Sequence, residues 1–215
     1  MRSEHIHQVV RILRKETRQW PVPAIGHYVE TPFTVLISCI LSLRTQDKTT
    51  NAASERLFAI ANTPEKILAT PVRAIQEAIY PVSFYRVKAR TIHSICEQLL
   101  ERYSGEVPSR LEQLLELPGV GRKTANIVVT LAFRKAGIAV DTHVHRISNR
   151  LGYVKTKTPN ETEMALRKKL PRRYWIVFND LLVAYGQNLC KPISPFCSNC
   201  KIAVYCRRVG VTTRR

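Results

Sequence analysis

The end of the chain carries four cysteines in a pattern that ordinary secondary structure does not explain. Cys190, Cys197, Cys200 and Cys206 lie within 17 positions and are separated by six, two and five residues. The segment from Cys190 onward has too little apolar periodicity to form a helix of its own. Because four thiolates so close together are typical of a metal centre, we expect the tail to fold around one.

The spacing of these cysteines leaves two kinds of metal centre open. A structural zinc site more often shows two Cys-x-x-Cys pairs, whereas this tail has only Cys197 and Cys200 in that arrangement. The pattern therefore favours an iron–sulfur cluster, with zinc as the alternative. No secretory signal is visible after Met1, so we expect a reducing compartment in which disulfides are disfavoured. Cys39 and Cys96 lie in apolar helical patterns and are predicted to be core residues.

The rest of the chain shows the apolar spacing of a series of helices, and no stretch shows the sustained alternation of a strand. Thr31-Pro32, Thr63-Pro64 and Thr158-Pro159 are typical helix starts, and Gly137 is a typical helix end. We also expect Asp47, Ser109 and Asp141 to cap helices. The predicted helices are residues 3–20, 32–43, 86–103, 111–117 and 122–136, one after Asp47, one after Asp141, two short ones after Thr63 and Pro71, and two more after Thr158 and Pro171. The predicted fold class is therefore all-α.

The balance of charge points to a polyanionic partner. The chain has 34 lysine and arginine residues against 16 aspartate and glutamate residues, a formal charge of +18. Such an excess favours nucleic acid through counterion release and electrostatic steering. A ribosome-associated protein, a membrane-surface binder and a merely basic surface are the alternatives. The longest apolar stretch, residues 35–43, is shorter than the roughly 20 residues of a membrane helix, so we expect a soluble protein with no membrane partner.

The sharpest local motif is Leu117-Pro118-Gly119-Val120-Gly121, which lies between two predicted helices. Its glycines allow a tight turn and a close approach, so backbone amides at the start of the following helix can point at a DNA phosphate. We interpret the motif as a helix-hairpin-helix turn, which would position DNA without reading its sequence. The predicted DNA-binding residues are Leu117, Gly119, Val120 and Gly121. An ordinary corner between two helices is the alternative.

Two charged residues beyond this turn are candidates for chemistry. Lys123 lies in the first turn of the following helix, where the positive helix end and Arg122 favour the neutral amine of a nucleophile. A lysine that only contacts phosphate is the alternative. Asp141 precedes Thr142 and is predicted to stand at a helix N-cap, where capping alone is the alternative to catalysis.

Taken with these motifs, the sequence resembles the endonuclease III family of bifunctional DNA glycosylases and apurinic/apyrimidinic lyases. The segments that carry the resemblance are Leu41-Ser42, Gly105-Glu106-Val107-Pro108, the stretch from Leu117 to Asn126, Val140-Asp141-Thr142-His143 and the four tail cysteines. The resemblance implies that Cys190, Cys197, Cys200 and Cys206 hold a [4Fe-4S] cluster. It also implies that Lys123 is the nucleophile and that Asp141 is an acid/base or charge-stabilising carboxylate.

The resemblance further implies a helix-hairpin-helix glycosylase fold with two helical modules. Residues 25–135 would form a six-helix barrel module that contains the hairpin turn. Residues 1–24 and 136–215 would combine into a second module that contains the cluster. DNA would bind in the cleft between the two modules.

The activity implied by the resemblance is base excision repair, in which oxidised pyrimidines are removed from duplex DNA. Lys123 would displace the base, form a Schiff base and break the strand by β-elimination. The expected partner is double-stranded DNA with damaged bases or abasic sites, and the expected enzyme is a cytoplasmic, nucleoid-associated monomer. Two rivals stay open: a monofunctional mismatch glycosylase of the same fold, which Lys123 argues against, and a non-catalytic helix-hairpin-helix DNA-binding protein with structural zinc.

Two positions depart from the usual pattern of that family. Arg44 stands where a glutamine is common, and Ser83-Phe84-Tyr85 stands where glycine, an aliphatic residue and tyrosine are usual. Both positions lie on loops that in the family enter the duplex. We hypothesise that Phe84 wedges beside the unpaired partner base and that Arg44 fills the gap left by the flipped nucleotide. The alternatives are a core aromatic and a phosphate-binding arginine. Lys191, the only basic residue between the first two tail cysteines, is expected to contact phosphate.

Overall fold

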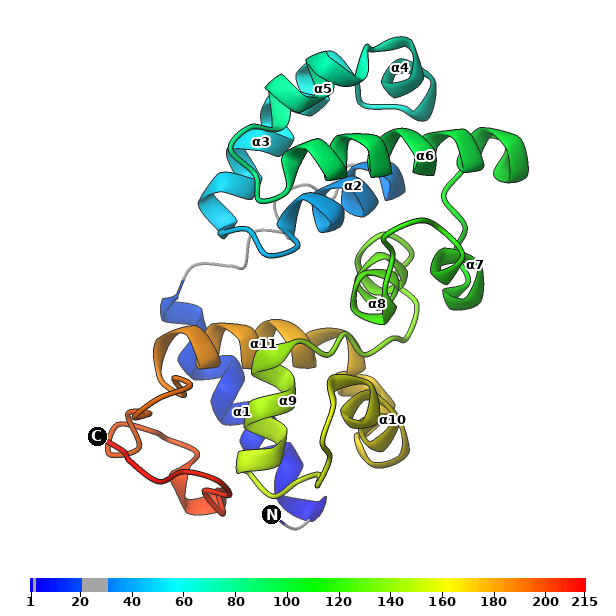
Figure 1. The fold of residues 1–215 in the computed structure, drawn as a ribbon. Helices are drawn as coiled ribbons and strands as arrows, with labels where there is room; N and C mark the ends of the chain where they lie inside the picture. The colour runs from blue at the N-terminus through cyan, green and yellow to red at the C-terminus, as the bar shows by residue number, and fades with distance from the viewer. Residues whose placement is uncertain (2, 21–30) are drawn as a thin grey trace. The chain divides into compact units, whose positions relative to one another are not determined.

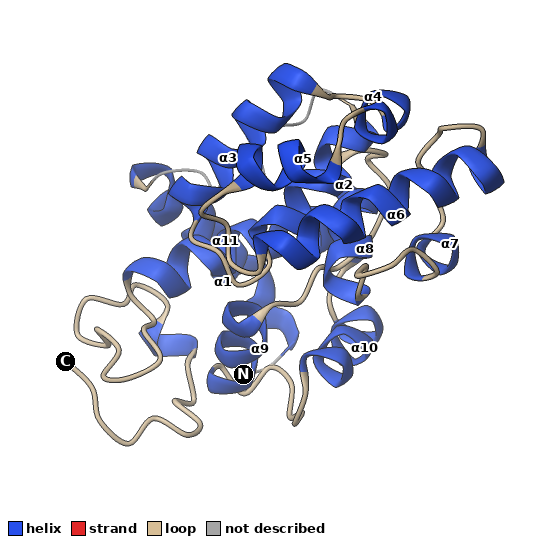
Figure 2. Ribbon diagram, turned by 45° about the horizontal axis from the view of Figure 1, so that its top comes forward, coloured by secondary structure: helices blue, strands red, loops and turns tan. Residues whose placement is uncertain are grey.

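The computed structural model describes residues 1, 3–20 and 31–215. Within these ranges every regular element is a helix, and Figure 2 shows no strand among them. The predicted all-α class is therefore confirmed. None of the helices described is both long and apolar enough to cross a membrane.

The chain divides into two compact units (Figure 1). The first, which we call the terminal unit, combines Met1–Pro23 with Ala136–Arg215, and the second, the central unit, is Ala24–Lys135. The boundary expected between residues 24 and 25 lies outside the described residues.

The central unit is built around one apolar helix, α2. Its described α-helices are α2 (Pro32–Ser42), α3 (Asp47–Ile60), α4 (Pro64–Ala69), α5 (Val72–Ile79), α6 (Tyr85–Tyr103), α7 (Leu111–Leu115) and α8 (Arg122–Leu131). In α2 every residue from Phe33 to Leu41 is buried, as expected of a helix that is apolar on all sides. Helices α3, α6 and α8 all pack against α2. These contacts therefore also fix where the loops next to those three helices begin and end.

The observed helix starts agree with the predicted starts better than the observed helix ends agree with the predicted ends. The Thr31 hydroxyl accepts from the Thr34 N–H at 3.1 Å and opens α2 just before Pro32, as predicted. The helix predicted over 122–136 instead ends at Leu131, so Gly137 does not close it. Arg134 adopts a left-handed conformation with φ 51°, and the Lys135 N–H donates to the Val129 carbonyl at 3.1 Å. The chain therefore leaves the helix before it reaches the glycine.

Two predicted caps are wrong. Asp47 is the first residue of α3 rather than its cap, and Gln46 takes the N-cap position. Arg110 is the N-cap of α7, and the Ser109 hydroxyl accepts from Nζ of Lys135 at 2.6 Å. The serine thus joins the loop before α7 to the loop after α8 instead of capping a helix.

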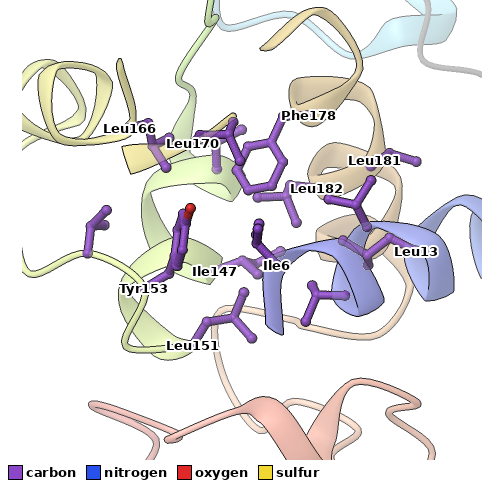
Figure 3. Close-up of a cluster of buried hydrophobic side chains, with 14 of the residues drawn as sticks. Ile6, Leu13, Ile147, Leu151, Tyr153, Leu166, Leu170, Phe178, Leu181 and Leu182 are labelled. Carbon is purple, nitrogen blue, oxygen red and sulfur yellow. The ribbon is translucent and has the colours of Figure 1, made fainter. Parts of the chain in front are cut away.

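The terminal unit brings the start of the chain against its last third. Its described helices are α1 (Ile6–Glu16), α9 (Thr142–Arg150), α10 (Pro159–Lys169) and α11 (Trp175–Asn188), with short 3-10 turns at Ser3–His5, Thr17–Gln19, Arg172–Tyr174 and Ala203–Tyr205. Figure 3 shows the core they share, where Ile6 of α1, Ile147 of α9 and Phe178 of α11 point toward one another. Burial of these apolar faces is the main stabilisation of the unit. The tail after α11 is irregular, as predicted (Figure 1, orange to red).

Helix α9 approaches α11 closely because residue 186 has no side chain. A Cβ atom at Gly186 would lie 2.3 Å from Nδ1 of His143 and 2.9 Å from Nη2 of Arg146. In the space left free, Arg146 donates from Nη2 to the carbonyls of Gly186 at 3.3 Å and Cys190 at 2.8 Å. Its charge thus lies at the C-terminal end of α11, where the helix dipole favours a cation.

We predict that Gly186→Ala lowers the stability of the protein. Alanine adds about 1 kcal/mol of helix propensity, but forcing a methyl group into an occupied space costs about 1–3 kcal/mol, and the Arg146 bonds would be displaced as well. The measurement is the midpoint of thermal unfolding followed by circular dichroism. Gly121→Ala is the matched control, because a Cβ atom there meets no atom within 4 Å. An unchanged or raised midpoint for Gly186→Ala would contradict the packing described.

Candidate functional site

The four tail cysteines line one cavity in the terminal unit. The wall of this cavity also includes apolar side chains of α9, α11 and the tail, among them Ile147, Leu151, Leu189, Phe196 and Ile202. Cys190, Cys197, Cys200 and Cys206 therefore share one apolar space although they come from different turns of the tail. The structure thus brings together the residues predicted to bind a metal.

Hydrogen-bond donors point at three of the four sulfur atoms. Nη1 of Arg150 lies 3.4 Å from Sγ of Cys190, and the Tyr185 hydroxyl lies 3.3 Å from Sγ of Cys200. The backbone N–H of Arg208 lies 3.4 Å from Sγ of Cys206. Donors around sulfur stabilise the anionic thiolate, which is the form that binds metal.

The thiols do not converge on one point. Among the described residues, no group of three or more histidine, cysteine, aspartate or glutamate side chains is arranged to hold a single metal ion. A tetrahedral zinc ion needs four ligands at about 2.0–2.3 Å from one centre. In an iron–sulfur cluster, by contrast, each thiolate binds a different iron atom.

Burial raises the pKa of the Cys200 and Cys206 thiols, although the Tyr185 hydroxyl works against this effect at Cys200. Both side chains would therefore release their protons when a cation binds. Burial also raises the pKa of Cys39 and of Cys96 to about 12, and both side chains are buried. These two cysteines are core residues, as predicted.

Two arginines of α9 hold the start of the cysteine tail. Besides Cys190, the Arg150 guanidinium donates to the carbonyl oxygens of Lys191 and Pro192, each at 2.6 Å. Arg146 donates from Nε and Nη2 to the Cys190 carbonyl at 3.2 and 2.8 Å. Neither arginine was predicted from the sequence as a site residue. Their spacing of four residues places both on one face of a helix and could have indicated a shared role. Two solvent-exposed arginines would show the same spacing.

Lys191 is engaged with its own helix. Its Nζ donates to the carbonyl of Gln187 near the C-terminal end of α11. The side chain therefore lies against the end of a helix in this structure. Its predicted contact with phosphate stays a prediction.

Asp141 stands at the N-cap of α9, as predicted. A single carboxylate oxygen, Oδ1, accepts from the N–H groups of His143 and Val144, both at 2.9 Å. Within the described part of the chain, the second oxygen has no hydrogen-bond partner. The side chain is only half-buried. Capping therefore uses one oxygen of the carboxylate and leaves the other available for chemistry.

The predicted hairpin turn lies between α7 and α8 in the central unit. Gly119 has φ +73°, which favours glycine, and Gly121 is the N-cap of α8 in an extended conformation. Gly121 supplies no side chain that could cap α8. Leu117 and Val120 are buried, so their side chains pack inside the central unit.

Lys123 lies in the first turn of α8 and is half-buried. Its positive charge acts on the thiol of Cys39, where it lowers the pKa against the larger effect of burial. The ammonium group is therefore within electrostatic reach of α2. Lys123 and the hairpin turn thus belong to one corner of the central unit.

The two residues that depart from the family pattern lie side by side. Phe84 is 61% exposed, so the alternative of a core aromatic is wrong. The guanidinium carbon of Arg44, also exposed, lies 5.9 Å from the centre of the Phe84 ring. This distance fits a cation–π contact.

Comparison with known proteins identifies a likeness over most of the chain. Residues 37–172 match the HhH-GPD superfamily of base excision DNA repair proteins. Endonuclease III from Thermotoga maritima is 49% identical over 181 residues, which cover 84% of this chain and 85% of that protein.

Solved structures extend the likeness to the three-dimensional fold. A non-covalent endonuclease III–DNA complex superposes with a TM-score of 0.88 at 35% identity and covers 97% of this chain and 96% of that one. A trapped covalent endonuclease III–DNA intermediate, an estranged-adenine complex, gives the same TM-score and identity and covers 97% of both chains.

Proposed function

The chain belongs to the HhH-GPD superfamily of base excision DNA repair proteins and, within it, to the endonuclease III family, and we infer that it is a bifunctional DNA glycosylase and apurinic/apyrimidinic lyase. The predicted helix-hairpin-helix glycosylase fold and the predicted family are thereby confirmed. We propose further that its substrates are oxidised pyrimidines in duplex DNA. The observation that carries the residue assignment is the position of Lys123 in the first turn of α8, directly after the hairpin turn.

Lys123 acts as the nucleophile in this proposal. Its neutral amine attacks C1′ of the flipped nucleotide while the bond between C1′ and the base breaks, and the base leaves with the bonding electrons and takes up a proton. Ring opening gives an iminium group between Lys123 and the sugar. The iminium acidifies the C2′ proton, and loss of that proton expels the 3′ phosphate and breaks the strand.

Asp141 supplies the carboxylate of the reaction. Positive charge develops at the sugar as the base leaves, and a carboxylate stabilises such a transition state. The free Oδ2 of Asp141 supports this role, because capping of α9 uses only Oδ1. The same oxygen can accept and return a proton during the lyase step.

The hairpin turn and the exposed pair Arg44 and Phe84 hold the DNA. The first N–H groups of α8, next to Gly119 and Gly121, bind a phosphate without reading the base. Phe84 wedges beside the orphaned partner base, and Arg44 fills the gap. Residues 25–135 form the six-helix barrel module, and residues 1–24 and 136–215 form the module with the cluster. We propose that the enzyme is a cytoplasmic, nucleoid-associated monomer that works on chromosomal DNA.

A [4Fe-4S] cluster is the group that we propose for the cavity of the terminal unit. Its ligands would be Cys190, Cys197, Cys200 and Cys206. The shared cavity and the donors aimed at the sulfur atoms support a metal centre there. The spacing of the cysteines favours a cluster over zinc. When bound, it supplies a cross-link between four points of the tail.

We predict that the protein purified without air contains iron and sulfide, about four irons per chain, and little zinc. Cys197→Ser should lower the iron content and the soluble yield, because a ligand is lost. Cys39→Ala should leave the iron content unchanged, because that thiol lies in the core of the other unit. Elemental analysis and the visible absorbance of the protein measure the effect. A colourless, active protein with one zinc per chain would refute the cluster.

Lys123→Gln should abolish the covalent complex that borohydride traps on DNA with an abasic site, because the nucleophile is lost. Affinity for DNA with a tetrahydrofuran abasic analogue should stay within about threefold, because the phosphate contacts remain. Lys135→Gln is the matched control, since it removes the same charge near the end of α8 and should keep the trapping. Undiminished trapping by Lys123→Gln would assign the nucleophile to another residue.

Asp141→Asn should slow base release by about 10²–10⁴-fold, the usual contribution of a general acid or base. Asparagine is as good an N-cap as aspartate, so the thermal midpoint should move little. Asp141→Ser separates the roles again, because serine caps but carries no carboxylate. Single-turnover rates on a thymine glycol duplex measure the effect. Normal turnover by the asparagine variant would leave Asp141 with capping alone.

A further inference from the structure

The loops that carry Arg44 and Phe84 are both held in unusual backbone conformations. Arg44 has φ 55° and Phe84 has φ 58°, although neither is glycine. A left-handed conformation is unfavourable for such residues and persists only where the surroundings hold it. The two side chains nevertheless lie together in solvent, at 5.9 Å. Contacts on the buried side of the two loops must therefore hold these backbone conformations.

Lys88 of α6 lies on that buried side. Its side chain is 7% exposed, and its Nζ donates to the carbonyls of Leu41 at 2.7 Å and Leu43 at 2.6 Å and to the hydroxyl of Thr45 at 3.2 Å. These three oxygens come from the end of α2 and from the Arg44 loop. The backbone N–H of Lys88 also donates to the Phe84 carbonyl at 3.0 Å. One residue thus contacts both loops.

Thr45 completes the link between the loops. Its hydroxyl oxygen accepts from Nζ of Lys88 and also from the backbone N–H of Ser83, at 3.2 Å. Ser83 directly precedes Phe84, and Thr45 directly follows Arg44. Hydrogen bonds of Thr45 and of Lys88 therefore link the residue that follows Arg44 to Ser83 and to the Phe84 carbonyl.

The chemistry of Lys88 suits a fixed link and not a surface contact. The carbonyl groups at the C-terminal end of α2 provide the negative end of a helix dipole, which favours a cation. Burial lowers the pKa of Lys88 to about 8, so the ammonium form still prevails at pH 7. That form has three N–H donors, and the three oxygens around it use all of them.

We propose that Lys88 and Thr45 are positioning residues that join the two loops, so that Arg44 and Phe84 enter the DNA stack as one preassembled unit. The proposal rests on the proposed function, in which these two side chains occupy the space of the flipped nucleotide and its partner base. A preassembled pair loses little conformational freedom on insertion. It also presents a guanidinium at a fixed offset from an aromatic ring, which makes the enzyme sensitive to the base opposite the lesion.

The decisive comparison uses Thr45→Val and Thr45→Ser in the full-length protein. Valine keeps the shape but removes the oxygen that joins Lys88 to Ser83, whereas serine keeps that oxygen. We expect Thr45→Val to slow base release from a paired thymine glycol about tenfold, as the loss of one well-placed hydrogen bond would. Cleavage at a preformed abasic site in single-stranded DNA should stay within about twofold. Thr45→Ser should restore base release.

A fluorescence measurement reports insertion without turnover. With 2-aminopurine opposite a tetrahydrofuran abasic analogue, wild-type enzyme should raise the fluorescence by unstacking that base, and Thr45→Val should raise it less. Lys88→Met provides a second variant that breaks the link. Equal slowing on both DNA substrates together with a lowered thermal midpoint would make the link merely structural and overturn the proposal. So would a Thr45→Val enzyme that behaves as wild type.

Single and double variants test whether Arg44 and Phe84 act as one unit. They also separate the proposed link between the loops from the proposed insertion of the two side chains into DNA. If the pair acts as one unit, the loss of base release in the Arg44→Ala, Phe84→Ala double variant should be smaller than the product of the single losses. In the Thr45→Val background the losses should multiply. Losses that multiply in both backgrounds would overturn the link and leave insertion intact. If neither single variant slows the paired lesion more than the abasic site, the insertion role fails together with the link.

Discussion

The close packing of α9 on α11 at Gly186 is the constraint on which the terminal unit depends. With this packing, each end of α9 contributes to a candidate functional site. At the N-terminal end, Asp141 uses one oxygen to cap the helix and keeps the other available. At the C-terminal end, Arg146 and Arg150 bind the carbonyls and the sulfur with which the cysteine tail begins. The candidate carboxylate and the cysteine cavity are therefore positioned by the same nine-residue helix.

In the proposed function the cysteine tail has a structural role that needs no redox chemistry. The tail has one short 3-10 turn as its regular structure among the described residues, and the arginines of α9 hold its start. A cluster that binds Cys190 and Cys206 would hold the tail against α9, because Arg150 at the end of α9 lies next to both sulfur atoms. The cluster and the core would then stabilise one another, and through α9 both would position Asp141.

Much of this could be predicted from the sequence where the signal is local. The Thr31-Pro32 start, the Asp141 cap and the irregular cysteine tail each follow from the chemistry of neighbouring residues. The end of α8 could not be predicted, because Arg134 adopts a left-handed conformation that usually marks glycine. Lys88 was missed because its contacts depend on the tertiary fold. A lysine on a long amphipathic helix is ordinarily exposed, and only the fold brings the carbonyls of α2 to its ammonium group.

In the proposed mechanism one lysine of the hairpin corner forms the bond to DNA. Wild-type enzyme can be reduced with borohydride on an oligonucleotide with an abasic site and digested with protease, and the DNA-linked peptide can be sequenced by mass spectrometry. We predict that the sugar remnant is attached to Nζ of Lys123. Attachment to Lys88, to Lys135 or to the N-terminal amine, or no attachment under conditions in which the strand is cut, would contradict it.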